Sequence, residues 1–211
     1  MIVVDVVECC RVLYKYVDLG LPSGLKWATC NVGATTPEEY GNYFAWGETV
    51  QKTVAYTWST LQYCTDDKGK KYSKYVPSGK AEFWGGAGSP DNKAVLDAGD
   101  DAATANWGAP WRTPTDAEWT ELRTKCTWTC TTRNGVKGYL VSNNGDSIFL
   151  PAAGYWNGTS LNDVDTDGYY WSSSLDLGYP MGAMLEHFDS GEIFMCYGYR
   201  CYGLPVRPVT E

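Results

Sequence analysis

Residues 155–209 read YWNGTSLNDVDTDGYYWSSSLDLGYPMGAMLEHFDSGEIFMCYGYRCYGLPVRPV. Two kinds of residue are interleaved in this segment. Some are typical of a folded framework, such as WSSS at 171–174 and VRPV at 206–209. The others are aromatic, small or acidic residues that lack the periodicity of a core. If they are exposed together, they have the composition of a binding surface, because rigid aromatic side chains supply contact area at low entropic cost.

The composition of the whole chain indicates one aromatic-rich globular domain. Its 211 residues include 10 tryptophans, 16 tyrosines and 23 glycines, and 44% of the residues are apolar. These numbers favour tight turns and loops around aromatic packing over a helical bundle. The net charge of −8, without a patch of lysine or arginine, argues against a nucleic-acid partner. No apolar run approaches the roughly 18 residues of a membrane helix, so the chain is not expected to span a membrane.

The N-terminus and the cysteines suggest neither a leader nor a metal site. The first seven residues are apolar but few, and Asp5 interrupts them, so they make no convincing signal peptide. Eight cysteines match no zinc-binding spacing, and the single histidine, His187, excludes a Cys₂His₂ site. A disulfide framework stays open, but free thiols are favoured because a chain of this length does not need covalent cross-links. No metal or cofactor is predicted.

Local signals predict an α+β domain over residues 16–211, preceded by an N-terminal strand or extension over residues 1–15. Pro22 and Gly24 mark a turn between two short strands. Asn-Gly at 134–135, Asn-Gly at 144–145 and Ser-Gly at 190–191 predict three further hairpins. The strands expected around these turns cover residues 126–132, 138–141, 147–150, 183–188 and 192–196, and a last strand covers residues 205–209.

Helix starts are predicted at three places. Thr36, followed by proline, indicates a short helix, and Asp100 is expected to introduce a helix within residues 97–106. The clearest helix is expected to begin with Thr113 as its cap and Pro114 as its first residue. Elsewhere, an aromatic strand is predicted over residues 43–48, and an insertion loop over residues 50–95, which are rich in glycine and polar turns.

Seven blocks of the sequence, taken in order, resemble a known family. They are YVDLGLPSGLKWATCNVGA from residue 16, YFAWGE from 43, DDAATANWG from 100, WRTPTDAEWTEL from 111, NGDSIFLPAAGYWNG from 144, GYYWSSS from 168 and VRPV from 206. Over residues 16–209 the chain thus resembles the Fibrobacter succinogenes major paralogous domain family, which is common in gut Bacteroidetes. The resemblance implies a C-type-lectin-like fold, related to that of formylglycine-generating enzymes, with two short helices, short antiparallel strands and long loops.

Within that family, the chain resembles the variable protein of a diversity-generating retroelement. Such a retroelement rewrites the 3′ end of a gene by mutating the adenines of a template copy. The resemblance implies a non-enzymatic, ligand-binding display protein with a variable region over residues 155–204. Its expected partner is an unidentified protein or glycan, and its expected location is a cell surface or a virion. The resemblance specifies no oligomeric state.

The genetic code tests this resemblance position by position. Mutation of the adenines in an AAC or AAT codon reaches Tyr, Cys, Gly, Asp, His, Leu and Phe, but neither Trp nor Glu. Most of the implied positions pass this test, whereas Trp156, Glu186 and Glu192 require another template codon. The implied ligand-binding set is Trp156, Asp163, Asp165, Asp167, Tyr169, Leu175, Leu177, Tyr179, Glu186, His187, Asp189, Glu192, Phe194, Cys196, Tyr197, Gly198, Tyr199, Cys201, Tyr202 and Leu204.

Alternation along the last hairpin predicts which of its side chains are exposed. Because successive side chains of a strand face opposite sides, Phe188, Ile193 and Met195 are expected to face the core, and Phe194 and Cys196 the solvent. A competing interpretation treats residues 155–209 as an ordinary loop-rich β region with a fixed surface, as in an adhesin module.

Two motifs suggest other chemistry, and neither is complete. Asp163-x-Asp165-x-Asp167 resembles the start of an EF-hand calcium loop, but its twelfth position is Ser174 and not the glutamate that binds calcium. The Glu-Pro-Asn and Trp-Asn-Asp motifs of sugar-binding C-type lectins are absent.

A cysteine pair leaves an enzyme as the weaker alternative. Cys196-x₄-Cys201 resembles the copper-binding cysteines of formylglycine-generating enzymes, but it lies closer to the chain end and among the implied variable positions. A nucleophilic pair of Cys196 with His187 lacks an identifiable orienting group. A copper-dependent oxidase is therefore not favoured, and no catalytic residue is assigned.

Overall fold

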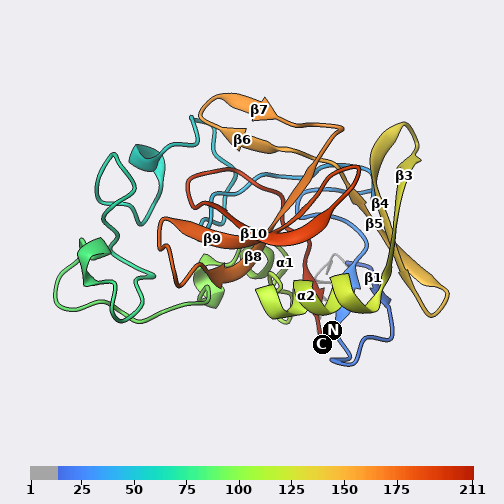
Figure 1. The fold of residues 1–211 in the computed structure, drawn as a ribbon, viewed down its shortest axis with the longest axis horizontal. Helices are drawn as coiled ribbons and strands as arrows, with labels where there is room; N and C mark the ends of the chain where they lie inside the picture. Colours follow the sequence, from blue (N-terminus) through green and yellow to red (C-terminus); the bar gives the residue numbers. More distant parts are fainter. Residues whose placement is uncertain (1–13) are drawn as a thin grey trace, which may run out of the picture.

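The computed structural model describes residues 14–211, which fold as a mixed α+β domain. Within this range, two short α-helices accompany four small antiparallel sheets (Figure 1). The α+β class predicted from the sequence is confirmed. Of the predicted N-terminal extension, only residues 14 and 15 are described, and Cys9 and Cys10 lie outside the described residues.

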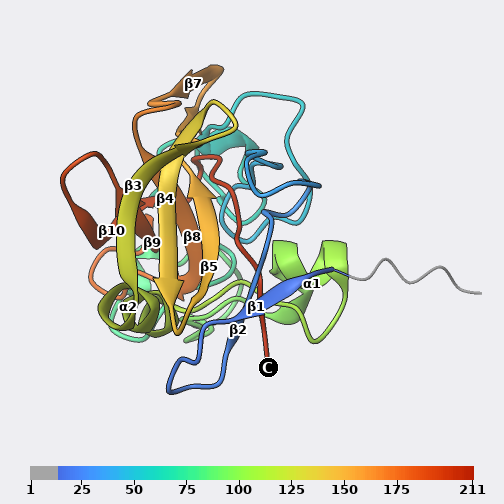
Figure 2. The same ribbon diagram turned by 90° about the vertical axis from the view of Figure 1, so that its right-hand side faces the viewer.

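The first and last strands belong to one sheet. β1 (Tyr16–Asp18) pairs with β2 (Lys26–Ala28), and β11 (Val209–Thr210) pairs with the other edge of β2. Gly24, with a φ of 73°, closes the predicted β1–β2 turn by donating its N–H to the Leu21 carbonyl over 2.8 Å. Figure 2 shows the C-terminus next to these strands. The last strand is shorter than predicted, because the prolines at 205 and 208 have no N–H to donate.

The two predicted Asn-Gly turns join the three strands of the sheet β3–β4–β5. It consists of β3 (Thr127–Arg133), β4 (Val136–Asn143) and β5 (Asp146–Pro151). Both turns have positive φ at both residues: 49° and 86° at 134–135, and 52° and 89° at 144–145. A type I′ hairpin turn needs such angles, and asparagine and glycine tolerate them best.

The helices begin slightly later than predicted. α2 (Asp116–Lys125) is capped by Thr115, whose hydroxyl accepts the N–H of Glu118 while the Glu118 carboxylate accepts the N–H of Thr115. The prediction that Thr113 is the cap was wrong, since its N–H and hydroxyl both donate to Asp101.

Asp101 is also the cap of α1 (Ala102–Trp107), because its carboxylate accepts the N–H groups of Ala103 and Thr104. The prediction that Asp100 introduces this helix was therefore wrong by one residue. The carboxylate of Asp100 has other partners, described below.

Two predicted elements before residue 50 do not form. The Glu39 carboxylate accepts the N–H of Thr35 over 2.6 Å and its hydroxyl over 3.0 Å. These bonds close a tight turn at the position of the predicted helix after Thr36. The predicted strand over residues 43–48 is reduced to one bridge between Phe44 and Leu204, because the chain turns at residues 46 and 47.

The predicted insertion, residues 50–95, holds little regular structure but shares a buried cluster with residues outside it, among them Tyr43 and Cys201. Two 3₁₀ turns lie in it, η1 (Trp58–Thr60) and η2 (Ala81–Phe83), and η3 (Ala98–Asp100) follows. Tyr56, Leu61 and Tyr72 are buried together in a separate cluster. Aromatic packing therefore holds this segment in place of strand pairing.

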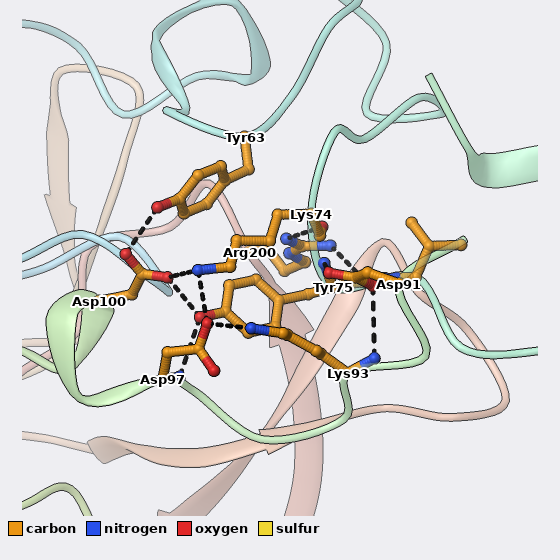
Figure 3. A network of polar contacts seen from close by, with 9 residues as sticks. Tyr63, Lys74, Tyr75, Asp91, Lys93, Asp97, Asp100 and Arg200 are labelled. Atoms are coloured by element: carbon orange, nitrogen blue, oxygen red, sulfur yellow. Dashed lines mark hydrogen bonds and ion pairs between the residues drawn. The ribbon is translucent and has the colours of Figure 1, made fainter. Parts of the chain in front are cut away.

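A polar network joins the insertion to the rest of the domain (Figure 3). The Asp100 carboxylate accepts hydrogen bonds from the Tyr63 hydroxyl over 2.6 Å, Lys74 Nζ over 2.5 Å and the Tyr75 hydroxyl. The fully buried Arg200 donates to the carbonyl oxygens of Tyr75 and Lys74, and its guanidinium faces three aromatic rings. Arg200 directly follows the last long strand, so this cation ties the insertion to the C-terminal segment.

The C-terminal segment forms the remaining two sheets. β6 (Tyr155–Asn157) pairs with β7 (Ser160–Asn162). β8 (Gly168–Leu175), β9 (Gly182–Phe188) and β10 (Ile193–Tyr199) form a second sheet with β9 in the middle. α2 packs on one face of that sheet, which is named the α2 face (Figure 1). The Ser-Gly turn between β9 and β10 confirms the last predicted hairpin.

Candidate ligand-binding surface

Seven aromatic rings follow one another across the C-terminal segment and the insertion. The centroids of successive rings lie between 4.5 and 5.4 Å apart, a spacing at which aromatic pairs stabilise one another. This set is named the aromatic row. In spatial order it consists of Phe194, His187, Tyr169, Tyr155, Tyr202, Tyr199 and Trp58.

Strand register places the first three rings side by side. Tyr169 of β8 lies opposite His187 of β9, which lies opposite Phe194 of β10. Residues directly opposite one another in a sheet point to the same side, so these rings share the face away from α2. β6 brings Tyr155 against Tyr169, and the turn after β10 brings Tyr202 against Tyr155. Separate segments of the chain therefore build one surface.

A hollow of about 130 Å³ opens in the middle of the aromatic row and is named the tyrosine hollow. Leu185 and Leu204 are its most deeply buried lining residues. The others are Tyr155, Tyr169, Cys196, Tyr197, Gly198 and Tyr202. Apart from Tyr155 and Leu185, every lining residue belongs to the set predicted from the sequence.

Two carboxylates bind the hydroxyl group of Tyr169, one of the residues that line the tyrosine hollow. The Tyr169 hydroxyl lies 3.1 Å from Asp163 Oδ2 and 3.0 Å from Asp167 Oδ2, and donates to these acceptors. Burial and the two carboxylates raise the pKa of Tyr169 well above its ordinary value, so its hydroxyl stays a neutral donor. Asp167 Oδ2 also lies 3.4 Å from His187 Nε2. The acids thus orient the aromatic row and keep negative charge at this edge.

The acidic repeat is not arranged as a calcium loop. Asp163 and Asp165 have positive φ angles of 56° and 61° and form a turn. Asp165 accepts the Tyr40 hydroxyl over 2.7 Å, whereas Ser174, at the twelfth position, donates to Asp116. Among residues 14–211, no group of three or more His, Cys, Asp or Glu side chains is placed to hold a metal ion.

Three more predicted residues extend the surface beyond the hollow. Tyr197 and Tyr199 are 52% and 36% exposed. The Tyr179 ring lies 5.7 Å from that of Tyr197, and partial burial together with the neighbouring Tyr199 and Tyr197 raises the pKa of Tyr179. Leu177 is exposed in the same turn as Tyr179. The exposure of Tyr197 and Tyr199 agrees with the sequence analysis, while ligand binding there stays a prediction.

Leu175, Cys201 and Leu204 were wrongly placed on the exposed surface. Leu175 and Leu204 pack with Trp171 in one core cluster, and Cys201 packs with Tyr56 in another. Leu204 reaches the surface only as part of the lining of the tyrosine hollow. The genetic code indicates which residue types a position can take, but it contains no information about the direction of a side chain.

Glu186 is fully buried on the α2 face, contrary to the prediction. Its Oε2 accepts a hydrogen bond from the Arg123 guanidinium of α2 over 3.0 Å, and its Oε1 has no partner among the described residues. Burial raises the pKa of Glu186 to about 8, although the charge of Arg123 opposes this rise. Glu186 precedes His187 by one residue in β9, so the two side chains face opposite sides.

His187 and Gly198 are buried as well, yet both shape the surface. The His187 ring stacks on Tyr169 with centroids 4.5 Å apart. A Cβ atom added to Gly198 would lie 2.7 Å from Leu185 Cδ2, within the lining of the tyrosine hollow. Glycine at position 198 therefore keeps this hollow open.

Trp156 lies apart from the aromatic row, so the predicted surface is not continuous there. Tyr155 and Trp156 are successive residues of β6 and point to opposite sides. The Trp156 ring stacks on Tyr56, with centroids 6.3 Å apart, and lies edge-on to Tyr43. It lines a separate hollow of about 270 Å³ with residues 51–56.

Asp189 and Glu192 belong to the β9–β10 turn. Asp189 Oδ1 accepts the N–H groups of Gly191 over 2.7 Å and Glu192 over 2.9 Å, which lowers the pKa of Asp189. Asp189 also lines a hollow of about 390 Å³ that includes Lys137, Asp165 and Asp167. The Glu192 side chain is exposed, as predicted.

The two cysteines near the C-terminus do not face one another. Cys196 lines the tyrosine hollow, half-buried and not fully exposed as predicted, while Cys201 lies in the core of the insertion. Burial raises the pKa of Cys196 to about 11 and that of Cys201 to about 12, so both are protonated thiols at neutral pH. The six cysteines within residues 14–211 are all free, as the sequence favoured.

The sequence analysis missed three residues of this surface. Tyr155 and Leu185 line the tyrosine hollow, and Trp58 ends the aromatic row. Alternation in β6 indicates that Tyr155 and Trp156 point to opposite sides, but it does not indicate which of them faces the hollow. No local signal connects Trp58 to the C-terminal segment, because it comes from the insertion.

Comparison with known protein families, curated proteins and solved structures gave no match to this chain. Over residues 14–211, no helix combines the length and apolar character needed to cross a membrane.

Proposed function

We propose that the protein is a non-enzymatic display protein that binds a protein or glycan through the aromatic row and the tyrosine hollow. One observation carries the proposal: tyrosines from separate segments gather into a single accessible surface. Tyrosine and tryptophan supply rigid, amphipathic contact area, and such residues dominate recognition surfaces. Such a role places the protein at a cell surface or on a virion.

The proposal includes a C-type-lectin-like fold and membership of the Fibrobacter succinogenes major paralogous domain family. The pairing of the first and last strands, the two short helices and the long packed insertion support it. It also includes diversification of the C-terminal surface by a retroelement. The exposure of Phe194, Tyr197 and Tyr199 on β10 supports this part, because replacements at exposed side chains disturb the core least.

We restrict the proposed ligand-contacting set to predicted positions whose side chains reach the accessible surface. Leu175, Glu186 and Cys201 are left out because each is buried away from the tyrosine hollow. The retained positions are Tyr169, Cys196, Tyr197 and Tyr202, which line the hollow, Phe194 and Tyr199, which belong to the aromatic row, and Asp163 and Asp167, which contact the Tyr169 hydroxyl.

Two matched display libraries test the proposal. The first randomises Tyr169, Phe194, Tyr197, Tyr199 and Tyr202 together. The control randomises the same number of core positions, namely Leu122, Tyr170, Trp171, Ala183 and Phe188. We expect most of the first library to stay folded and to yield binders against unrelated target proteins, and the control library to lose protease resistance. A first library that unfolds as completely as the control would contradict the proposal.

Sequencing the DNA that flanks the gene separates retroelement diversification from a fixed adhesin surface. We expect a reverse transcriptase gene and a near-copy of the segment that encodes residues 155–204. If neither is present, the binding surface is a fixed one.

A further inference from the structure

We infer that the tyrosine hollow binds the cationic side chain of an arginine or lysine on a basic protein partner. This inference rests on the proposed binding function and specifies the chemistry of the ligand. Size, aromatic lining and charge each support it.

The size of the hollow suits one long side chain. Its volume of about 130 Å³ is too small for a folded element of a partner but accommodates a single extended side chain. Leu185 and Leu204 present apolar surface at its deepest part. Arginine and lysine pack their methylene stems along such surface while the charged group stays near polar atoms.

The tyrosine rings around the hollow favour a cation. The face of an aromatic ring attracts a nearby cation, and more strongly where solvent is excluded. The molecule itself contains such an arrangement, since the Arg200 guanidinium carbon lies 4.1 Å from the ring centroid of Tyr72 and 5.0 Å from that of Trp46. Tyr155, Tyr169 and Tyr202 line the tyrosine hollow, and we assign their rings to the cation of a ligand.

The charge of the surface favours a basic partner. Residues 155–211 contain no lysine, and their two arginines, Arg200 and Arg207, are fully buried. Within the described residues, each of Asp163 and Asp167 uses only Oδ2 in side-chain hydrogen bonds, which leaves its Oδ1 for a ligand. Further acids of the segment are exposed or half-buried, namely Asp165, Asp176, Asp189 and Glu192. Complementary charge of this kind selects partners and accelerates their association.

Two cationic or titratable groups lie close to this edge and bear on the inference. His187 lies beside Asp167, and Lys137 lines the neighbouring hollow together with Asp165 and Asp167. Neither side chain lines the tyrosine hollow itself.

Nuclear magnetic resonance titration of protein with isotope-labelled tyrosine tests the inference without a known natural ligand. The probes are n-butylguanidinium and its neutral analogue n-butylurea, which have nearly the same shape. We expect butylguanidinium to shift the signals of Tyr155, Tyr169 and Tyr202 saturably and to bind at least about threefold more tightly than butylurea. Tyr16, exposed on β1, serves as an internal reference that should not respond.

A double variant and a salt titration complete the test. Asp163→Asn with Asp167→Asn keeps the shape of the edge and removes its charge, so the preference for butylguanidinium should disappear. Concentrated sodium chloride should reduce the same preference in the unmodified protein, which guards against an effect of the variant on folding.

Equal binding of the two probes would overturn the inference and leave an apolar side-chain site. Saturable shifts with methyl β-galactoside in place of either probe would overturn it in favour of a glycan. The absence of any saturable shift would also overturn it. None of these outcomes affects the library test, so a failure of this inference is distinguishable from a failure of the proposed binding function.

Discussion

On the α2 face of the β8–β9–β10 sheet, Tyr170 and Phe188 pack with Trp119 of α2 in the largest core cluster. On the opposite face, their sequence neighbours Tyr169 and His187 belong to the aromatic row. Both faces are rich in aromatic residues, and both come from the same strands. They differ in what packs against them. The helix α2 covers the first, whereas on the second Trp171 and Leu185 belong to another core cluster and Phe194 stays exposed.

This difference indicates at which positions a side chain can be replaced without unfolding the protein. Side chains under α2 share their contacts with the whole core, so each replacement there disturbs many neighbours. In the aromatic row, Tyr155, Tyr169 and Tyr202 also pack against a core cluster, but Phe194 and Tyr199 are 39% and 36% exposed. Replacements at such exposed side chains usually cost less than about 0.5 kcal/mol. A surface of this kind tolerates diversification, provided that the residues alternating with it stay constant.

The largest contrast is expected between two phenylalanines of the same hairpin. Phe188→Ala should lower the free energy of unfolding by about 3–5 kcal/mol, because it leaves a cavity beside Tyr139 and Tyr170. Phe194→Ala, at a side chain that is 39% exposed, should cost less than about 1 kcal/mol. Urea denaturation measures both. Similar losses for the two variants would show that the two faces are equally part of the core.

A smaller, pH-dependent effect on the stability of the protein is expected from Glu186 on the α2 face. Its pKa is about 8 in the folded protein against 4.5 for the free side chain. Below pH 4.5 the group is protonated in both states. As the pH rises from 4.5 to about 8, the unfolded chain releases this proton first, so the folded state loses stability progressively. Above that range the loss is complete.

Glu186→Gln should remove this loss, and at pH 7 the variant should be more stable than the unmodified protein by about 3 kcal/mol. Glu192→Gln, an exposed change of the same kind, is the control and should leave the pH profile unchanged. Thermal denaturation across the pH range measures both variants. Parallel profiles for Glu186→Gln and the unmodified protein would contradict the buried-acid interpretation.

The smallest contrast is expected between the consecutive tyrosines of β8. The Tyr170 hydroxyl is buried and donates to the Pro151 carbonyl over 2.8 Å, so Tyr170→Phe should cost about 1 kcal/mol. Tyr169→Phe removes a hydroxyl whose acceptors, Asp163 and Asp167, keep access to water, and it should cost less than about 0.5 kcal/mol. Chemical denaturation under identical conditions measures the free energy of unfolding of both variants. A larger loss of stability for Tyr169→Phe than for Tyr170→Phe would contradict the prediction.

Much of the framework was predictable from local sequence. The Asn-Gly turns depend on the φ angles that only a few residues tolerate, and the helix starts depend on capping by nearby side chains. Alternation also placed Phe188 in the core and Phe194 at the surface correctly. Helix boundaries were less accurate, because Thr113 and Thr115 offer equivalent caps and Asp101 takes the hydroxyl of Thr113.

The candidate surface was only partly predictable. Its aromatic and acidic composition was visible in residues 155–204, but composition does not distinguish Glu186, which faces α2, from its neighbour His187, which faces the other side of the sheet. Trp156 was assigned to the surface although it faces the insertion. Cys196 is half-buried because Tyr155 and Tyr202 cover part of the sheet, a contact between distant segments that no local pattern contains.

The amino-acid sequence by itself determined the α+β class, the turns, the negative charge and the aromatic composition of the C-terminal segment. These properties depend on the conformational preferences and charges of residues that are near in sequence. Only the tertiary structure decided which of those aromatic residues surround the tyrosine hollow and which are sealed under α2. That decision depends on what packs against each face of the sheet, and the packing partners, among them Arg123, Trp58 and Tyr56, come from segments far away in the chain.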